Sequence, residues 1–93
     1  MKYLKANPKL VLREESDDWA VLFDPDTGHT YALNPVAVLI WKHLTGTNSE
    51  QDIWQLINEE VDALPAEAQK QIKTFLTCVH TLGLADYVES EPS

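Results

Sequence analysis

Hydrophobic and polar residues in the first third of the chain follow the two-residue period of β-strands. Residues Leu10–Glu14 alternate in the way expected of an edge strand. Residues Trp19–Phe23 are almost continuously apolar, which is typical of a central strand covered on at least one face. His29–Leu33 adds a third stretch, with β-branched and aromatic side chains. The pattern predicts an antiparallel meander of three strands, whose apolar face needs a helical layer to cover it.

The segment that joins the second and third stretches, Asp24–Gly28, has the chemistry of a tight turn. Its proline presets the backbone angle of the first central position, and an aspartate side chain accepts from the amides of the turn. Its glycine adopts a left-handed conformation without a steric penalty. We therefore predict a hairpin between these two strands.

From residue 34 onward the apolar spacing changes to that of helices. Asn34 and Pro35 predict an N-cap followed by proline at the first helical position, and Gly46 is expected to end this first helix. Ser49 and Asp52 have the spacing of a capping box at the start of a second helix. The apolar stripes of the two helices are Val36, Leu39, Ile40 and Leu44, and then Ile53, Leu56, Ile57 and Val61.

A third helix is expected to open at Pro65, where no residue specifies a clear cap, and to close at Gly83 in a left-handed conformation. Its buried stripe consists of Ile72, Phe75, Leu76, Val79 and Leu82. The order of elements predicts an α+β fold, in which a three-stranded antiparallel meander is followed by three helices, as in winged helix-turn-helix domains. We expect residues 1–9 to be a flexible lead-in, residues 10–88 to be the domain and residues 89–93 to be a flexible tail.

Charge argues against one class of partner, the nucleic acids. The net charge is −8, and from Glu14 onward only three basic residues accompany fifteen acidic ones. Such a field repels a nucleic-acid backbone, whose binding requires several lysine or arginine contacts. The longest apolar run, Val36–Trp41, is too short to span a bilayer, and the N-terminal residues lack the apolar core of a signal peptide. With a single cysteine, Cys78, the sequence indicates a cytoplasmic protein without membrane or nucleic-acid partners.

No group of residues has the spacing of a catalytic or metal-binding site. The three histidines lie far apart, and Cys78 and His80 point about 200° apart on the predicted third helix. Three glycines in the whole chain do not supply a phosphate-binding loop. We therefore expect neither an enzyme nor a cofactor-binding protein.

The aromatic residues are expected to serve mainly as core. Trp19, Phe23, Trp41 and Phe75 fit the predicted apolar faces. Tyr31 fits two positions, either at the rim of an open strand or packed on the helical layer.

The ordered set of short motifs resembles the PqqD family. The motif Asp-Pro-x-Thr-Gly-x-x-Tyr-x-Leu-Asn occupies residues 24–34, and an apolar helix with Ile40-Trp41 and a closing Thr45-Gly46 follows it. A serine-capped second helix and a long third helix ending in residues 82–84, Leu-Gly-Leu, complete the set. The similarity extends from about Val11 to Val88.

The resemblance implies a peptide chaperone, also called a precursor-peptide recognition element. Such proteins bind the leader of a ribosomally made precursor peptide and present it to a modifying enzyme, commonly a radical S-adenosylmethionine (SAM) enzyme. The leader is expected to add as a strand in the groove between the third strand and the third helix, and no cofactor is implied. Carried over by position, the expected peptide-binding residues are His29, Thr30, Tyr31, Ala32, Leu33, Lys73, Leu76, Thr77 and His80.

Several alternatives stay open. A structural subunit bound to a folded enzyme fits the same acidic surface, and a winged-helix DNA-binding regulator shares part of the element order. Lys70 and Lys73 either face the groove, which would favour an acidic leader residue, or lie in solvent. An open strand edge also allows a monomer or a weak dimer. The pathway is either coenzyme PQQ biosynthesis or that of another peptide product.

Overall fold

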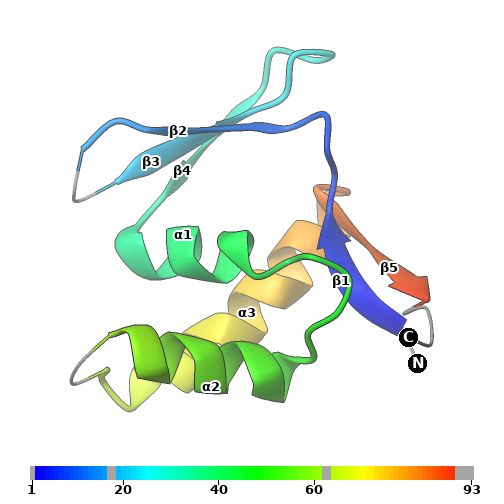
Figure 1. The fold of residues 1–93 in the computed structure, drawn as a ribbon. Helices are drawn as coiled ribbons and strands as arrows, with labels where there is room; N and C mark the ends of the chain where they lie inside the picture. The colour runs from blue at the N-terminus through cyan, green and yellow to red at the C-terminus, as the bar shows by residue number, and fades with distance from the viewer. Residues whose placement is uncertain (1, 17–18, 62–63, 90–93) are drawn as a thin grey trace.

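The computed structural model describes residues 2–16, 19–61 and 64–89. Three layers are visible in Figure 1: a three-stranded sheet, a group of three helices, and a two-stranded ribbon beside the helices. The sheet consists of β2 (Val11–Glu14), β3 (Ala20–Phe23) and β4 (Thr30–Leu33). The expected α+β class, with an antiparallel meander followed by three helices, is confirmed.

The meander has β3 at its centre, antiparallel to β2 on one side and to β4 on the other. The side chains of Ala20 and Leu22 are buried against the helical layer, which confirms that one face of this strand is covered. Trp19 precedes the strand and is 46% exposed, so the expectation that it belongs to the core is wrong. Because successive residues of a strand point to opposite faces, an inward Ala20 directs its neighbour Trp19 outward.

The hairpin between β3 and β4 forms as predicted. Asp24 N–H donates to His29 C=O at 2.9 Å, and Gly28 N–H donates to Asp24 C=O at 2.8 Å. The Asp24 carboxylate accepts from Asp26 N–H at 2.9 Å, and Gly28 has the positive φ of 77° that the turn requires.

Helix α1 (Pro35–Lys42) begins with the predicted cap, since the Asn34 side chain accepts from Ala37 N–H at 2.8 Å. It ends at Lys42 with His43 as its C-cap, so the expectation that Gly46 ends this helix is wrong. The chain turns earlier because the residues after the helix bond to the N-terminal strand. Gly46 N–H donates to Leu4 C=O at 3.0 Å, and its φ of 83° serves this contact.

Helix α2 (Glu50–Glu60) carries the predicted capping box, in which Ser49 and Asp52 each accept from the other's backbone N–H. Helix α3 (Glu67–Thr81) begins two residues after Pro65 and has no side-chain cap. Its end is the expected left-handed one, with Gly83 at a φ of 76° and Leu84 N–H donating to Val79 C=O at 2.9 Å.

The ribbon was not expected. Strand β1 (Lys2–Ala6) pairs antiparallel with β5 (Ala85–Glu89), so the prediction of a flexible lead-in over residues 1–9 is wrong for residues 2–6. Leu4 is 5% exposed and belongs to the core. Its burial holds β1 against the helices, although the sequence of this strand shows little apolar character. Of the predicted tail, Glu89 is the last residue of β5, and residues 90–93 lie outside the described part of the chain.

One continuous core joins the sheet, the helices and the ribbon. Trp41 lies in it as expected, and Phe75 packs against its edge half-buried. The fully buried side chains at its centre are Leu22, Ile40, Ile53, Ile57, Ile72 and Val79. Within the described residues, no helix has the length and apolar character needed to cross a membrane.

Candidate functional site

The outer edge of β4 pairs with no other strand among the described residues, since β4 adjoins β3 alone. The bond between Asp24 and His29 marks a hydrogen-bonded pair at the hairpin end. Hydrogen-bonded pairs alternate with non-hydrogen-bonded pairs in an antiparallel sheet, so Tyr31 also directs its backbone groups toward β3. The backbone N–H and C=O groups of Thr30 and Ala32 therefore point outward along an open edge.

A hollow of about 330 Å³ lies between this edge and α3, and we call it the β4–α3 groove. Tyr31 and Leu33 point into the helical side of the sheet, half-buried and buried respectively, whereas Thr30 and Ala32 are exposed. Side chains from β4, α1, α3 and the residues after α3 line the groove: Tyr31, Ala32, Leu33, Asn34, Ala37, Phe75, Cys78, Val79, Leu82 and Leu84. An extended peptide paired with β4 would lay alternate side chains on this apolar floor.

A second hollow of about 440 Å³ lies between α1 and α3, and we call it the α1–α3 cleft. Asn34, Ala37, Phe75 and Cys78 line both hollows, so the two adjoin each other along α3. The remaining residues that line the cleft are Val36, Ile40, Glu67, Lys70, Gln71 and Thr74.

The structure brings together only part of the predicted site. Thr30 and Ala32 lie on the open edge, and Tyr31 and Leu33 line the groove as expected. His29 lies in the hairpin turn, where its backbone N–H donates to the Thr27 hydroxyl at 3.2 Å.

The four predicted residues of α3 lie on another flank of the helix. Lys73, Leu76 and Thr77 line a separate pocket with the ribbon and the start of α2. His80 packs edge-on against Tyr87 of β5, with ring centroids 4.9 Å apart. Their expected position facing β4 is therefore wrong, because successive helical residues rotate by about 100°. Contact between this flank and a peptide stays a prediction.

Sequence reasoning missed the residues of α3 that do face β4. Phe75, Cys78 and Leu82 recur at helical spacing beside the core stripe, and Leu82 is 50% exposed. That spacing was visible in the sequence, and Phe75 and Leu82 were assigned to the buried face. What the sequence did not reveal was the ribbon, which lies beside the opposite flank of α3 and borders a pocket there.

Charged groups are sparse in these two adjoining hollows. Glu67 and Lys70 line the α1–α3 cleft and have opposite signs, whereas Lys73 lines the pocket on the ribbon side. The two lysines considered together in the sequence thus border different hollows. Cys78 is exposed beside the groove. No group of three or more histidine, cysteine, aspartate or glutamate residues within the described ranges is placed to hold a metal ion.

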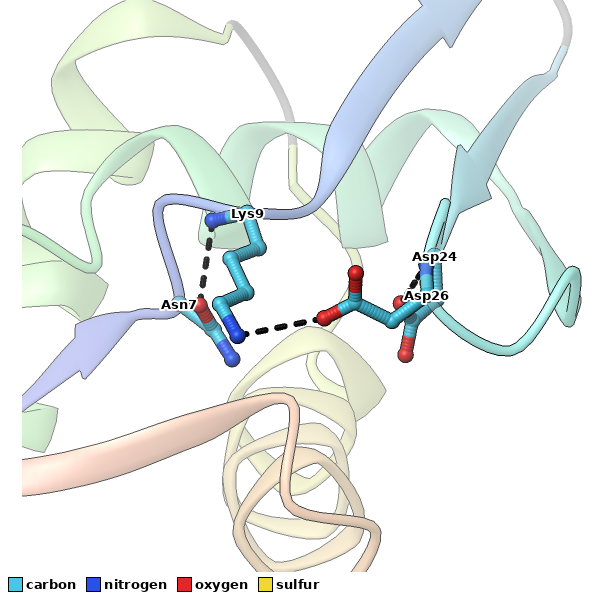
Figure 2. Close-up of polar contacts among 4 residues, drawn as sticks. All are labelled: Asn7, Lys9, Asp24 and Asp26. Atoms are coloured by element: carbon cyan, nitrogen blue, oxygen red, sulfur yellow. Dashed lines mark hydrogen bonds and ion pairs between the residues drawn. The ribbon is translucent and has the colours of Figure 1, made fainter.

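Polar contacts connect the β3–β4 hairpin to the turn at residues 7–10, which lies near the end of α3 (Figure 2). Lys9 Nζ donates to the Asp26 carboxylate at 3.1 Å, and the Asn7 side chain accepts from Lys9 N–H at 3.0 Å. Asn7 N–H in turn donates to Leu84 C=O at 2.9 Å. The hairpin tip is therefore connected to the residues that end the groove, through an exposed ion pair worth about 1 kcal/mol or less.

Comparison with known proteins adds a family and two related folds. The family model of coenzyme PQQ synthesis protein D (PqqD) matches residues 20–85, which include β3, β4 and all three helices. A solved structure described as TbiB1 in complex with the TbiA(beta) leader peptide is 22% identical, with a TM-score of 0.67, and the match covers 92% of this chain and 99% of that one. Another, described as lasso peptide synthetase B1 complexed with the leader peptide, is 25% identical, with a TM-score of 0.66 and coverage of 89% and 96%. No curated protein matches the chain.

Proposed function

The chain belongs to the PqqD family, whose model matches most of its length, and we propose that it is a non-catalytic chaperone for a precursor peptide. It binds the leader of a ribosomally made peptide by strand addition to β4 and presents that peptide to a modifying enzyme. The observation that carries the proposal is the open edge of β4 beside an apolar groove. Unpaired backbone groups supply affinity in this mode of binding, and side-chain pockets supply selectivity.

The two solved structures support a leader peptide as the ligand, since each is described as a complex of a protein of this fold with a leader peptide. Both are similar to this chain over at least 89% of its length. Of the residues expected from the sequence, we retain Thr30–Leu33 as the strand that pairs with the leader, with His29 in the adjoining turn. On α3 we assign Phe75, Cys78 and Leu82 to the groove.

The chaperone itself needs no cofactor, and the chemistry belongs to the enzyme that receives the peptide. We propose a radical SAM enzyme as that partner, on the family resemblance. An enzyme that matures lasso peptides is the second candidate, because one of the two solved neighbours is described as lasso peptide synthetase B1. We place the protein in the cytoplasm, where precursor peptides are made. It is a monomer or a weak dimer, and a second copy paired with β4 would compete with the leader for the same edge.

The test uses synthetic peptides encoded by short open reading frames beside the gene. Amide chemical shifts of the labelled protein are followed during titration with each peptide. We expect perturbations on residues 29–33 and on the α3 flank that carries Phe75 and Cys78. Binding of a neighbouring enzyme without any response to peptides would replace the chaperone with the structural-subunit function, and salt-dependent retention of DNA would support a regulator.

A matched pair of variants tests the strand pairing itself. Ala32→Pro removes an outward-pointing N–H that makes no bond to β3, and edge strands tolerate proline at such positions. Ala32→Val keeps that N–H and adds a side chain favoured in strands. We expect the proline variant to lose at least tenfold in peptide affinity and the valine variant to bind normally. Equal affinity of two folded variants would overturn strand addition to β4.

A further inference from the structure

The α1–α3 cleft adjoins the β4–α3 groove along α3, yet strand pairing with β4 does not fill it. Its floor consists of apolar side chains, among them Val36, Ile40 and Phe75. Its rim consists of the exposed polar side chains of α3, Glu67, Lys70, Gln71 and Thr74. An apolar floor within a polar rim is the usual form of a site that takes one apolar side chain.

The direction of an added strand determines which part of a bound peptide reaches this cleft. All three strand pairs of the molecule are antiparallel within the described residues, and we take the added strand to follow them. Strand β4 runs from Thr30 to Leu33, and Asn34 follows and lines both hollows. A peptide antiparallel to β4 therefore has its N-terminal side at Leu33 and Asn34, next to the opening of the cleft.

We propose that the α1–α3 cleft is a specificity site for a bulky apolar side chain from the leader residues that precede the added strand. The occupant is a segment of the same peptide, because the cleft and the β4–α3 groove share four lining residues. Glu67 and Lys70 present opposite charges at the rim, so size and apolar character select the side chain and its charge does not. This inference rests on the proposed function, since it needs a leader on β4.

The test compares two tryptophan substitutions on α3, with a fluorescent copy of each peptide that binds the wild-type protein. Gln71→Trp places a large ring in the cleft. Gln69→Trp introduces the same ring two residues earlier, about 200° around the helix, at an exposed position outside the cleft. We expect the dissociation constant to rise at least tenfold for Gln71→Trp and to stay within twofold for Gln69→Trp. Thr74→Trp, which also lines the cleft, replaces Gln71→Trp if that variant does not fold.

An alanine scan of the same peptide gives the second readout. One bulky apolar residue on the N-terminal side of the strand should cost about ten- to a hundredfold in affinity when truncated, as expected for a fully buried side chain. The same truncation should cost little in Gln71→Trp, because the cleft is already filled. If both tryptophan variants bind like wild type while Ala32→Pro does not, the cleft assignment is overturned and the chaperone function stands. If no peptide binds the wild-type protein, both are overturned.

Discussion

Cys78 and His80 are two residues apart on α3 and face different parts of the molecule. Cys78 lines the groove beside β4, whereas His80 packs against Tyr87 of β5 at a centroid distance of 4.9 Å. The rotation of about 200° that separates them was expected from the sequence. The sequence does not show what this rotation leads to in the fold, where one flank of α3 faces the β4–α3 groove and the other faces the ribbon.

Alkylation of Cys78 should block peptide binding. The thiol is exposed, it is the only cysteine of the chain, and it borders both hollows. A maleimide adduct at this position would occupy the apolar floor, so we expect at least a tenfold loss of affinity by fluorescence anisotropy. Mass spectrometry confirms the single adduct. The Cys78→Ser variant is the control, and binding that the reagent does not change in the wild-type protein would contradict the groove assignment.

Tyr31→Glu should weaken peptide binding and leave the protein folded. The Tyr31 side chain is half-buried, lines the β4–α3 groove and packs against the core, so a carboxylate there would face an apolar peptide surface. We expect at least a tenfold loss of affinity, measured by calorimetry, with circular dichroism as the check on folding. Tyr31→Phe keeps the ring and should bind within about threefold of wild type. A folded glutamate variant with normal affinity would remove Tyr31 from the site.

Gly46→Ala should destabilise the protein more than Gly28→Ala. Both glycines have positive φ, of 83° and 77°, and a left-handed conformation costs an alanine about 1–2 kcal/mol. A Cβ at Gly46 would also lie 2.8 Å from Val88 Cγ2, whereas one at Gly28 would meet nothing within 4 Å. The overlap should add about 1–3 kcal/mol to the loss in free energy of unfolding, measured in urea. Equal losses would show that the ribbon moves freely to accommodate the methyl group.

Leu4→Ala should cost about 2–5 kcal/mol of stability if the ribbon is part of the folded domain. Leu4 is 5% exposed and packs in the same core as the helices. Val11→Ala is the control, because Val11 is 46% exposed on β2 and its truncation should cost under about 1 kcal/mol. The measurement is again urea denaturation followed by circular dichroism. A neutral Leu4→Ala would return residues 2–6 to the status of a flexible lead-in.

Local chemistry made most of the fold predictable. Four local features form as expected, and each is specified by neighbours within a few residues. They are the turn before β4, the Asn34 N-cap of α1, the capping box at Ser49 and the left-handed end of α3 at Gly83. The end of α1 was not predictable in this way. Glycine is the residue type that often follows the end of a helix. At Gly46, however, the positive φ allows a hydrogen bond to Leu4, more than forty residues earlier in the chain.

The ribbon accounts for the errors in the candidate site. Its two strands are separated by almost the whole chain, and β1 shows only one buried apolar residue, Leu4, among polar neighbours. No local signal pairs such segments, so the sequence does not show which flank of α3 lies beside the ribbon and which faces β4. The strand half of the site was predictable, since the hairpin chemistry and the motif of residues 24–34 locate β4 directly.

The ribbon also determines how the protein can be joined to others. In its register Lys2 pairs with Glu89, at the end of the ribbon away from β4, whereas Ala6 and Ala85 pair near the residues that end the groove (Figure 1). A linker attached at either end of the described chain would thus not cross the open edge of β4. A modifying enzyme tethered there by a short flexible linker would meet the bound leader at an effective concentration on the order of millimolar. The same architecture therefore suits a free-standing chaperone and a fused recognition domain alike.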